Sequence, residues 1–306
     1  MKLGINGTGL VQSADVARIA DHAAAAAADG FQSYWLAEHP TGGLDALTVL
    51  GAVGQRVKDI ELGTAVVPTH PRHPLALAAQ TLTTAGIVEQ PLTLGIGLSH
   101  ATMMDELGIG FDKPIRHLRE YLSILMPLLR EGQVDFSGET LSTRAKLFKP
   151  PAAEVPVVVA ALGPQALGVA GRMTDGTTLA WVGPKTVHEH IVPRLSAAAA
   201  EAGRAAPRVI ATLPVCVTED EQTVRDTIGR GLKLYGELPS YKAMFEREGV
   251  AGPGELALVG SENAVRDGVA AMAEAGVTDF AASEFILNRA DGERTRALLK
   301  DLQAAL

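Results

Sequence analysis

Residues that can give or accept protons directly follow two apolar segments that are predicted to be buried strands. Glu38 and His39 follow residues 33–37, and His100 follows residues 92–98. A carboxylate beside an imidazole is suited to general acid–base chemistry, because histidine titrates near neutral pH. We therefore expect these side chains to form one site if the two strands end at the same edge of a sheet.

A third segment of this kind is the richest in the chain. Residues 60–67 are β-branched and apolar, which indicates a buried parallel strand. The next seven residues, 68–74, hold three prolines, two histidines and an arginine. Proline cannot donate to a β-ladder and disfavours a helix, so a stiff, extended turn is predicted there. Such a turn presents His70, Arg72 and His73 at the carboxyl end of the strand.

Strand-like and helix-like segments alternate along the whole chain, which predicts a single (β/α)8 barrel domain over residues 1–306. In such a barrel the active face lies at the carboxyl ends of the strands. Residues 134–150, after the fourth helix, are predicted to be a hairpin-like insertion. The eight strands are expected at residues 3–6, 33–37, 60–67, 92–98, 155–161, 177–182, 209–217 and 279–285.

Several other interpretations of the motifs are weaker. The histidines at strand ends suggest a metal site, but the first strand offers only Asn6, and residues 188–190 place two histidines two apart on a helix, where they diverge. Gly95 and Gly97 resemble the start of a dinucleotide fingerprint, but His100 stands at the third glycine position. These glycines let a ligand lie against the strand, or serve packing alone.

Residues 160–165, Ala-Ala-Leu-Gly-Pro-Gln, place small residues at a strand end and a Gly-Pro pair at the start of a helix. Proline is favoured in the first helical turn. The backbone amides near Gly163 and Gln165, together with the helix dipole, form a candidate phosphate site. An ordinary strand-to-helix turn is the alternative interpretation.

Composition narrows the classes of partner and compartment. The formal net charge of −8 argues against nucleic acid or an anionic membrane surface as a partner. Cys216 is the only cysteine, so no disulfide framework is expected and the cytoplasm is the predicted location. The first residues become polar too early for a signal peptide, and no apolar run is long enough to span a bilayer.

Three motifs together resemble the luciferase-like barrel family of flavin and deazaflavin oxidoreductases. They are residues 62–68 with 72–74, residues 94–100, and residues 160–164, and the resemblance extends over nearly the whole chain. Within the family the chain is most similar to the bacterial branch that uses coenzyme F420, and FMN is the alternative cofactor. His100 stands where some relatives carry a glutamate.

The resemblance implies a set of site residues. The tricyclic ring would lie against a bulge on the third strand, with a non-prolyl cis peptide expected at Thr64–Ala65. Glu38, His39 and His100 are the expected catalytic residues, with His39 or His100 as the proton donor. The expected cofactor-binding residues are Thr64, Ala65, Val66, Gly97, Ala161, Leu162, Gly163, Gln165 and Trp181.

The resemblance also implies an activity and an assembly. Hydride transfer between F420 and a small organic substrate is expected, and the alternatives are FMN-dependent oxygenation, a non-catalytic flavin-binding barrel and a metal-dependent hydrolase. The anionic tail of F420 would meet Arg144, Lys146, Lys149 and Lys185. A homodimer is expected through the helices at 45–57 and 73–88, because their small and apolar residues cover more of each helix than the one face that packs on the core. These residues are Leu47, Val49, Leu50, Ala76, Ala78 and Ala79.

Overall fold

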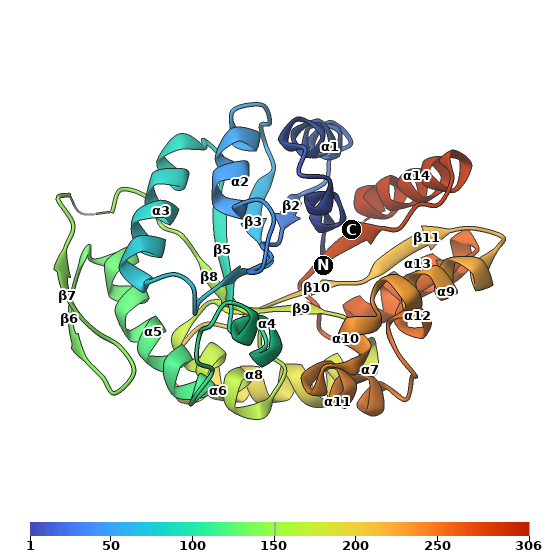
Figure 1. The fold of residues 1–306 in the computed structure, drawn as a ribbon. Coiled ribbons are helices and arrows are strands. Elements are labelled where there is room, and N and C mark those ends of the chain that lie inside the picture. The colour runs from blue at the N-terminus through green and yellow to red at the C-terminus, as the bar shows by residue number, and fades with distance from the viewer. Residues whose placement is uncertain (150, 306) are drawn as a thin grey trace.

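The computed structural model describes residues 1–149 and 151–305, and its strands form a closed parallel barrel (Figure 1). The first strand pairs with both the second and the last barrel strand, and this pairing closes the ring. The predicted (β/α)8 barrel is therefore confirmed. Its strands, in the order around the ring, are β1 (Lys2–Asn6), β2 (Ser33–Leu36), β3 (Glu61–Thr64), β5 (Leu92–Gly97), β8 (Val157–Val159), β9 (Gly176–Ala180), β10 (Arg208–Thr212) and β13 (Asp279–Glu284).

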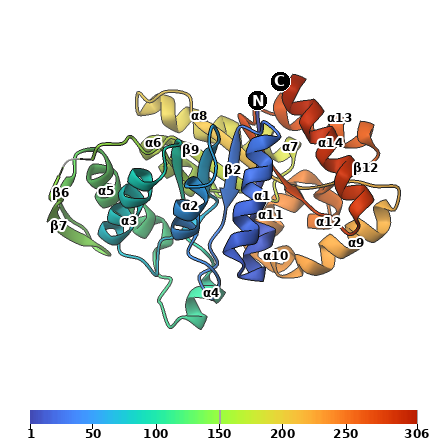
Figure 2. The ribbon, with the colours of Figure 1, turned by 90° about the horizontal axis from the view of Figure 1, so that it is seen from above.

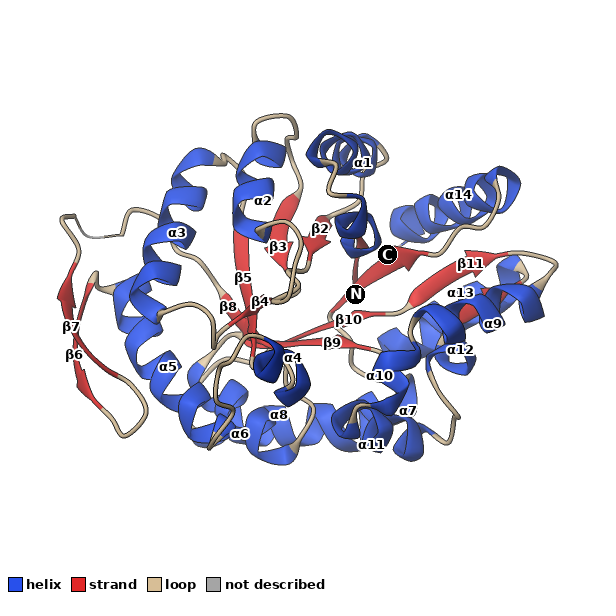
Figure 3. Ribbon diagram, viewed as in Figure 1, coloured by secondary structure: helices blue, strands red, loops and turns tan. Residues whose placement is uncertain are grey.

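Helices surround the strands on the outside (Figures 2 and 3). The longer ones are α1 (Val16–Ala28), α2 (Ala46–Gly54), α3 (Pro74–Ile87), α5 (Pro114–Arg130), α6 (Pro164–Met173), α8 (Val192–Glu201), α9 (Glu221–Gly231), α11 (Pro239–Glu248), α13 (Glu262–Glu274) and α14 (Arg289–Ala305). Shorter ones are η1 (Thr8–Ser13), α4 (Ala101–Glu106), α7 (Pro184–Thr186), η2 (Val187–Ile191), α10 (Lys233–Glu237) and α12 (Pro253–Leu256). No helix in the described ranges is both long and apolar enough to cross a membrane.

Two predicted strands are each broken in two. The strand expected at 60–67 ends at Thr64 and resumes as β4 (Val67–Pro68), which pairs with β5. The cis peptide in the intervening bulge joins Ala65 and Val66, one residue later than the expected Thr64–Ala65 bond. The strand expected at 209–217 divides into β10 and β11 (Pro214–Val217), and β11 pairs with the unpredicted β12 (Leu258–Gly260).

A partly buried ionic cluster lies at the amino ends of the barrel strands. Arg208 donates to Glu61 at 2.8 Å and to Asp279 at 2.6 Å, and Thr93 donates to Glu61 at 2.6 Å. The guanidinium also lies 5.9 Å from the ring of the fully buried Trp35. Because each charge has partners, the cluster satisfies its polar groups while filling the barrel at the amino ends of the strands.

The predicted insertion is an antiparallel hairpin of β6 (Gln133–Ser137) and β7 (Ser142–Lys146) beside α5. The carboxylate of Glu120 on α5 accepts hydrogen bonds from the backbone N–H groups of Glu139 and Leu141, both at 3.0 Å. This contact fixes the hairpin turn against the barrel. Pro150, the last residue of the predicted insertion, lies outside the described residues.

The helix faces offered above as a dimer contact are mostly buried within one protomer. The side chains of Leu47, Val49, Leu50 and Ala78 are at most 4% exposed, so their apolar character is explained by the core. Only Ala76 and Ala79 of the six residues are exposed. The homodimer stays a prediction, supported by the resemblance rather than by a second apolar face.

Candidate active site

A cavity of about 570 Å³ opens at the carboxyl ends of the strands. Its walls come from the ends of β1, β5, β8, β9 and β10, from the bulge after β3, and from the segments that begin α4, α6 and α11. Cavities of this size and position hold the ligands of α/β barrels. The volume is within the range that accommodates a cofactor ring and a small substrate.

Six of the residues expected from the sequence line this cavity, and they come from three separate segments of the chain. The bulge contributes two of them, the end of β5 and the following turn contribute two, and the turn before α6 contributes two. They are Ala65, Val66, Gly97, His100, Leu162 and Gly163. The folded chain therefore brings together the core of the predicted site.

Thr64 and Ala161 support the site from behind instead of lining it. The hydroxyl of Thr64 donates to the carbonyl oxygen of Gly95 and accepts from its N–H, both at 2.8 Å. This pair of bonds fixes the strand just before the bulge. Ala161 is 1% exposed and packs in the core.

Glu38 is engaged in an ion pair outside the cavity lining. Its carboxylate accepts from Arg72 at 3.0 Å and from the backbone N–H of Ala46 at 3.2 Å. Burial raises the pKa of Glu38, and the opposing charge of Arg72 offsets only part of this effect. Arg72 also contacts Asp45 at 2.8 Å, so the group joins the end of β2 to the start of α2 and to the turn after β4. The arrangement positions the loop that carries His39.

His39, Gln165 and Trp181 lie around the cavity without lining it. His39 is partly exposed, and its carbonyl oxygen accepts from the N–H of Gly42 at 3.3 Å. Gln165 faces a separate groove between α5 and α6. The ring of Trp181 packs 5.8 Å from that of Tyr235, and its backbone is left-handed, with φ of 58°. The roles predicted for these three residues stay predictions.

His100 is the titratable side chain best placed for proton transfer. Its ring lies 5.7 Å from the ring of Tyr241 and 6.5 Å from that of Tyr235. Burial lowers the pKa of His100, so the imidazole is neutral at pH 7. A neutral imidazole that lines a cavity can accept a proton from a bound hydroxyl group.

The structure adds polar residues that the sequence analysis did not select. Asn6, at the end of β1, donates from its side chain to the hydroxyl of Thr212 at 3.2 Å and accepts from the N–H of Thr8 at 2.9 Å. Thr178 and Tyr241 also line the cavity. The only sign of these polar residues in the sequence is threonine in each of β9 and β10, and a threonine in a strand is more often a packing residue.

An aromatic stack supports one wall of the cavity. Phe111 lines the cavity and stacks on His70 with ring centroids 4.9 Å apart, and His70 stacks on His117 at 4.0 Å. Nδ1 of His70 lies 3.1 Å from the carbonyl oxygen of Leu98. Burial, with the neighbouring His70, lowers the pKa of His117 to about 4. Burial also lowers the pKa of His70, so both rings are neutral at pH 7 and pack as aromatic groups.

The cavity lining carries no fixed charge. Among the described residues that line it there is no lysine, arginine, aspartate or glutamate, and the titratable members are His100 and Tyr241. Burial raises the pKa of Tyr241, which keeps its hydroxyl protonated. In residues 1–149 and 151–305, no three side chains of histidine, cysteine, aspartate or glutamate gather in a way that would hold a metal ion.

The chain is similar in sequence to known enzymes. Over 225 residues the chain is 30% identical to F420-dependent glucose-6-phosphate dehydrogenase of Nakamurella multipartita, covering 68% of this chain and 66% of that protein. It is 26% identical to 5,10-methylenetetrahydromethanopterin reductase of Methanolobus tindarius over 219 residues, covering 72% and 67%. The chain thus spans about two-thirds of the length of these relatives.

A solved structure and a family model extend the similarity to the whole fold. Coenzyme F420 dependent tetrahydromethanopterin reductase from Methanopyrus kandleri superposes with a TM-score of 0.81 at 21% identity, covering 98% of this chain and 97% of that one. The model of the luciferase-like monooxygenase family matches residues 3–279. The chain therefore belongs to the luciferase-like monooxygenase family, an enzyme family of oxidoreductases, as the motifs at residues 62–68, 94–100 and 160–164 predicted.

Proposed function

We propose that this protein transfers a hydride between coenzyme F420 and a small, uncharged organic substrate such as an alcohol or its carbonyl product. The names of its sequence relatives, an F420-dependent dehydrogenase and a methylenetetrahydromethanopterin reductase, support the cofactor. The uncharged cavity lining supports an uncharged substrate.

The residues around the cavity fit a flat ring. A methyl group added to Gly97 would lie 2.7 Å from Cγ2 of Val66 and 3.3 Å from Cβ of Ala160, so glycine leaves the floor flat between them. Ala65 and Val66 would hold the ring from the bulge, and the amides around Gly163 would take a phosphate group at the start of α6. A bound deazaflavin supplies a ring carbon that gives or accepts a hydride.

The protein itself must then move one proton. Oxidation of an alcohol releases the hydroxyl proton as the hydride leaves carbon, and the neutral imidazole of His100 is suited to accept it. In the reverse direction the same group, once protonated, returns the proton to the carbonyl oxygen. The hydroxyl groups of Thr212 and Tyr241 offer hydrogen bonds that orient the substrate oxygen. His39 remains the second candidate for the proton.

The uncharged lining disfavours a sugar phosphate as the substrate of this chain. The amides around Gly163 are assigned to the phosphate of the cofactor, and the rest of the lining offers no cation, so moving a second phosphate dianion from water into the cavity is strongly unfavourable. An uncharged alcohol or carbonyl compound meets no such penalty among apolar walls and a few hydroxyl groups. Glucose 6-phosphate is therefore expected to be a poor substrate.

Two measurements test the proposal. Titration of the protein with F420 and with FMN, followed by fluorescence, should give micromolar binding of F420 and weaker binding of FMN. Absorbance of F420 should then fall on addition of an uncharged secondary alcohol and remain constant with glucose 6-phosphate. Micromolar binding of FMN alone would favour the alternative, an FMN-dependent monooxygenase, and binding without turnover of any substrate would favour a non-catalytic barrel.

A further inference from the structure

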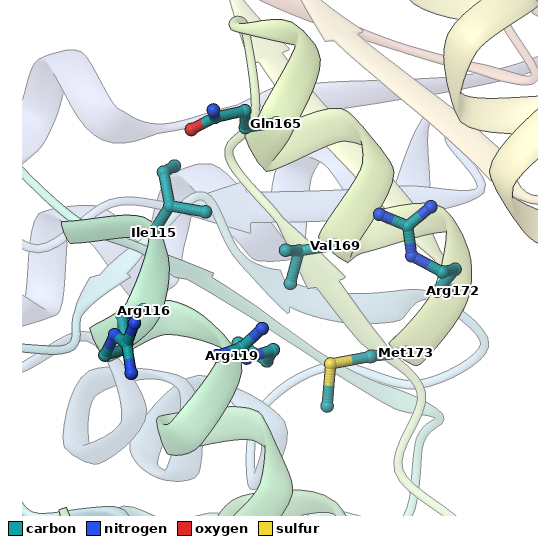
Figure 4. Close-up of a pocket in the computed structure, with 7 residues that line it drawn as sticks. All are labelled: Ile115, Arg116, Arg119, Gln165, Val169, Arg172 and Met173. Carbon is teal, nitrogen blue, oxygen red and sulfur yellow. The ribbon is translucent and has the colours of Figure 1, made fainter. Parts of the chain in front are cut away.

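A second groove of about 630 Å³ lies between α5 and α6 (Figure 4). Its walls combine three arginines and a glutamine with an apolar floor. The lining residues are Ile115, Arg116, Arg119, Gln165, Val169, Arg172 and Met173. No carboxylate of the described chain lines the groove, although the whole chain has a net charge of −8. Local positive charge in an acidic protein indicates a site for an anion.

Within the described chain, the three guanidinium groups form ion pairs only with exposed carboxylates or form none. No ion pair of Arg119 is found among the described residues. Arg172 lies 3.7 Å from Glu201, and both side chains are more than half exposed. Arg116 contacts Glu139, which is shared with Lys113 on the hairpin side. An incoming carboxylate can therefore bind these groups without disrupting a buried network.

The arginines come from both helices that form the groove (Figure 4). Arg116 and Arg119 are three residues apart on α5, so they project from the same side of that helix. Arg172 folds back over Gly168 on α6, where an added Cβ would lie 2.8 Å from a guanidinium nitrogen. This places its charge toward the amino end of α6, the direction in which long helical side chains normally lean.

The groove adjoins the active-site cavity. Ile115 lines both. On the other side, Gly163 and Ala166 line the cavity while Gln165, between them in the sequence, lines the groove. A ligand that fills the cavity and places a phosphate at the start of α6 would thus lie next to Ile115 and Gln165, the residues at the cavity end of the groove.

We propose that this groove binds the oligoglutamate chain of F420, with Arg119 and Arg172 as its principal contacts. The inference rests on the proposed function. It replaces the earlier expectation that Arg144, Lys146, Lys149 and Lys185 meet the chain. The structure separates those residues, with the hairpin and α7 on opposite sides of the barrel in Figure 1. Arg144 is, in addition, paired with Asp135 at 2.8 Å.

The test compares three ligands on the full-length protein by fluorescence titration. They are F420 with several glutamates, the same cofactor without glutamates, and the deazaflavin core without phosphate or glutamate. Exposed guanidinium–carboxylate pairs each contribute about a 1.5- to fivefold gain in affinity, so two such pairs should make the wild type bind the glutamylated form about 2- to 25-fold more tightly than the form without glutamates. Raising the salt concentration should reduce this ratio.

Matched variants assign the effect to the groove. The double variant Arg119→Gln/Arg172→Gln should lose the preference for glutamates and bind the deazaflavin core as the wild type does. Arg144→Gln, which removes an exposed arginine from the hairpin, should keep the full preference. Equal affinities for the two cofactor forms in the wild type, or a preserved preference in the double variant, would overturn the groove assignment. Failure of even the core to bind would instead remove the proposed cofactor itself, and the groove proposal with it.

Discussion

Replacing Gly95 by alanine should damage the bulge that forms one wall of the cavity. An added Cβ at this position would lie 2.0 Å from the carbonyl oxygen of Thr64, whereas real Cβ contacts essentially never fall below 3.0 Å. The two strands must therefore separate locally by about 1 Å. The obstacle is backbone, so no side-chain rotation can relieve it.

The size of the effect follows from what holds the two residues together. Separation weakens both hydrogen bonds between Thr64 and Gly95, each worth about 0.5–1.5 kcal/mol. Overpacking of a filled core adds about 1–3 kcal/mol. The total loss of about 2–6 kcal/mol in the free energy of unfolding corresponds to a fall in thermal midpoint of roughly 3–9 °C for a domain of this size.

Thermal unfolding followed by circular dichroism at one fixed scan rate measures this change. Gly86→Ala is the matched control, because Gly86 lies on exposed α3 with no atom within 4 Å of an added Cβ. That variant should match or slightly exceed the wild type in stability, since alanine favours a helix. If Gly95→Ala unfolds at the same temperature as Gly86→Ala, the strand contact at the bulge is not as close as described and the reasoning fails.

Three further outcomes are expected. Gly97→Ala should lower the thermal midpoint less than Gly95→Ala, because its close contact is a side chain, while weakening F420 binding at least tenfold in a fluorescence titration. Glu38→Gln should cost about 1.5–3 kcal/mol in denaturant unfolding, since it loses the charged bonds to Arg72, and should reduce turnover less than tenfold. Alcohol oxidation should fall as the pH drops through the lowered pKa of His100, and His100→Asn should abolish this acid limb and reduce turnover about 100-fold or more. If the limb persists in that variant, His100 is not the base, and His39→Ala should then reduce turnover at least tenfold.

The barrel was predictable because each buried strand is a short apolar run with turn residues at its end. The motifs around residues 62–68, 94–100 and 160–164 likewise located six cavity-lining residues, since parallel strands end at one face. Exact backbone events were not predictable. The break at Leu213 and the cis bond after Ala65 depend on neighbours that are far away in the sequence.

Side-chain roles were harder to predict than strand positions. Glu38 has the residue type and the place of a catalytic carboxylate, yet its pairing with Arg72 becomes visible only when the turn after β4 is folded beside it. The arginines of α5 and α6 were overlooked because they are separated by more than 40 positions and each is unremarkable alone. Only the packing of the two helices gathers them into one groove.

The ionic cluster of Arg208, Glu61 and Asp279, together with Trp35, fills the barrel at the amino ends of its strands. Ligands therefore enter and leave the cavity at the carboxyl ends of the strands. Of two ligands held there together, the deeper one has to arrive first and depart last. Steady-state kinetics should therefore follow a compulsory order, and product-inhibition patterns will reveal which partner is the inner one. The ionic cluster at the amino ends of the strands, although it lies far from the reacting atoms, thereby determines the order in which ligands bind and dissociate.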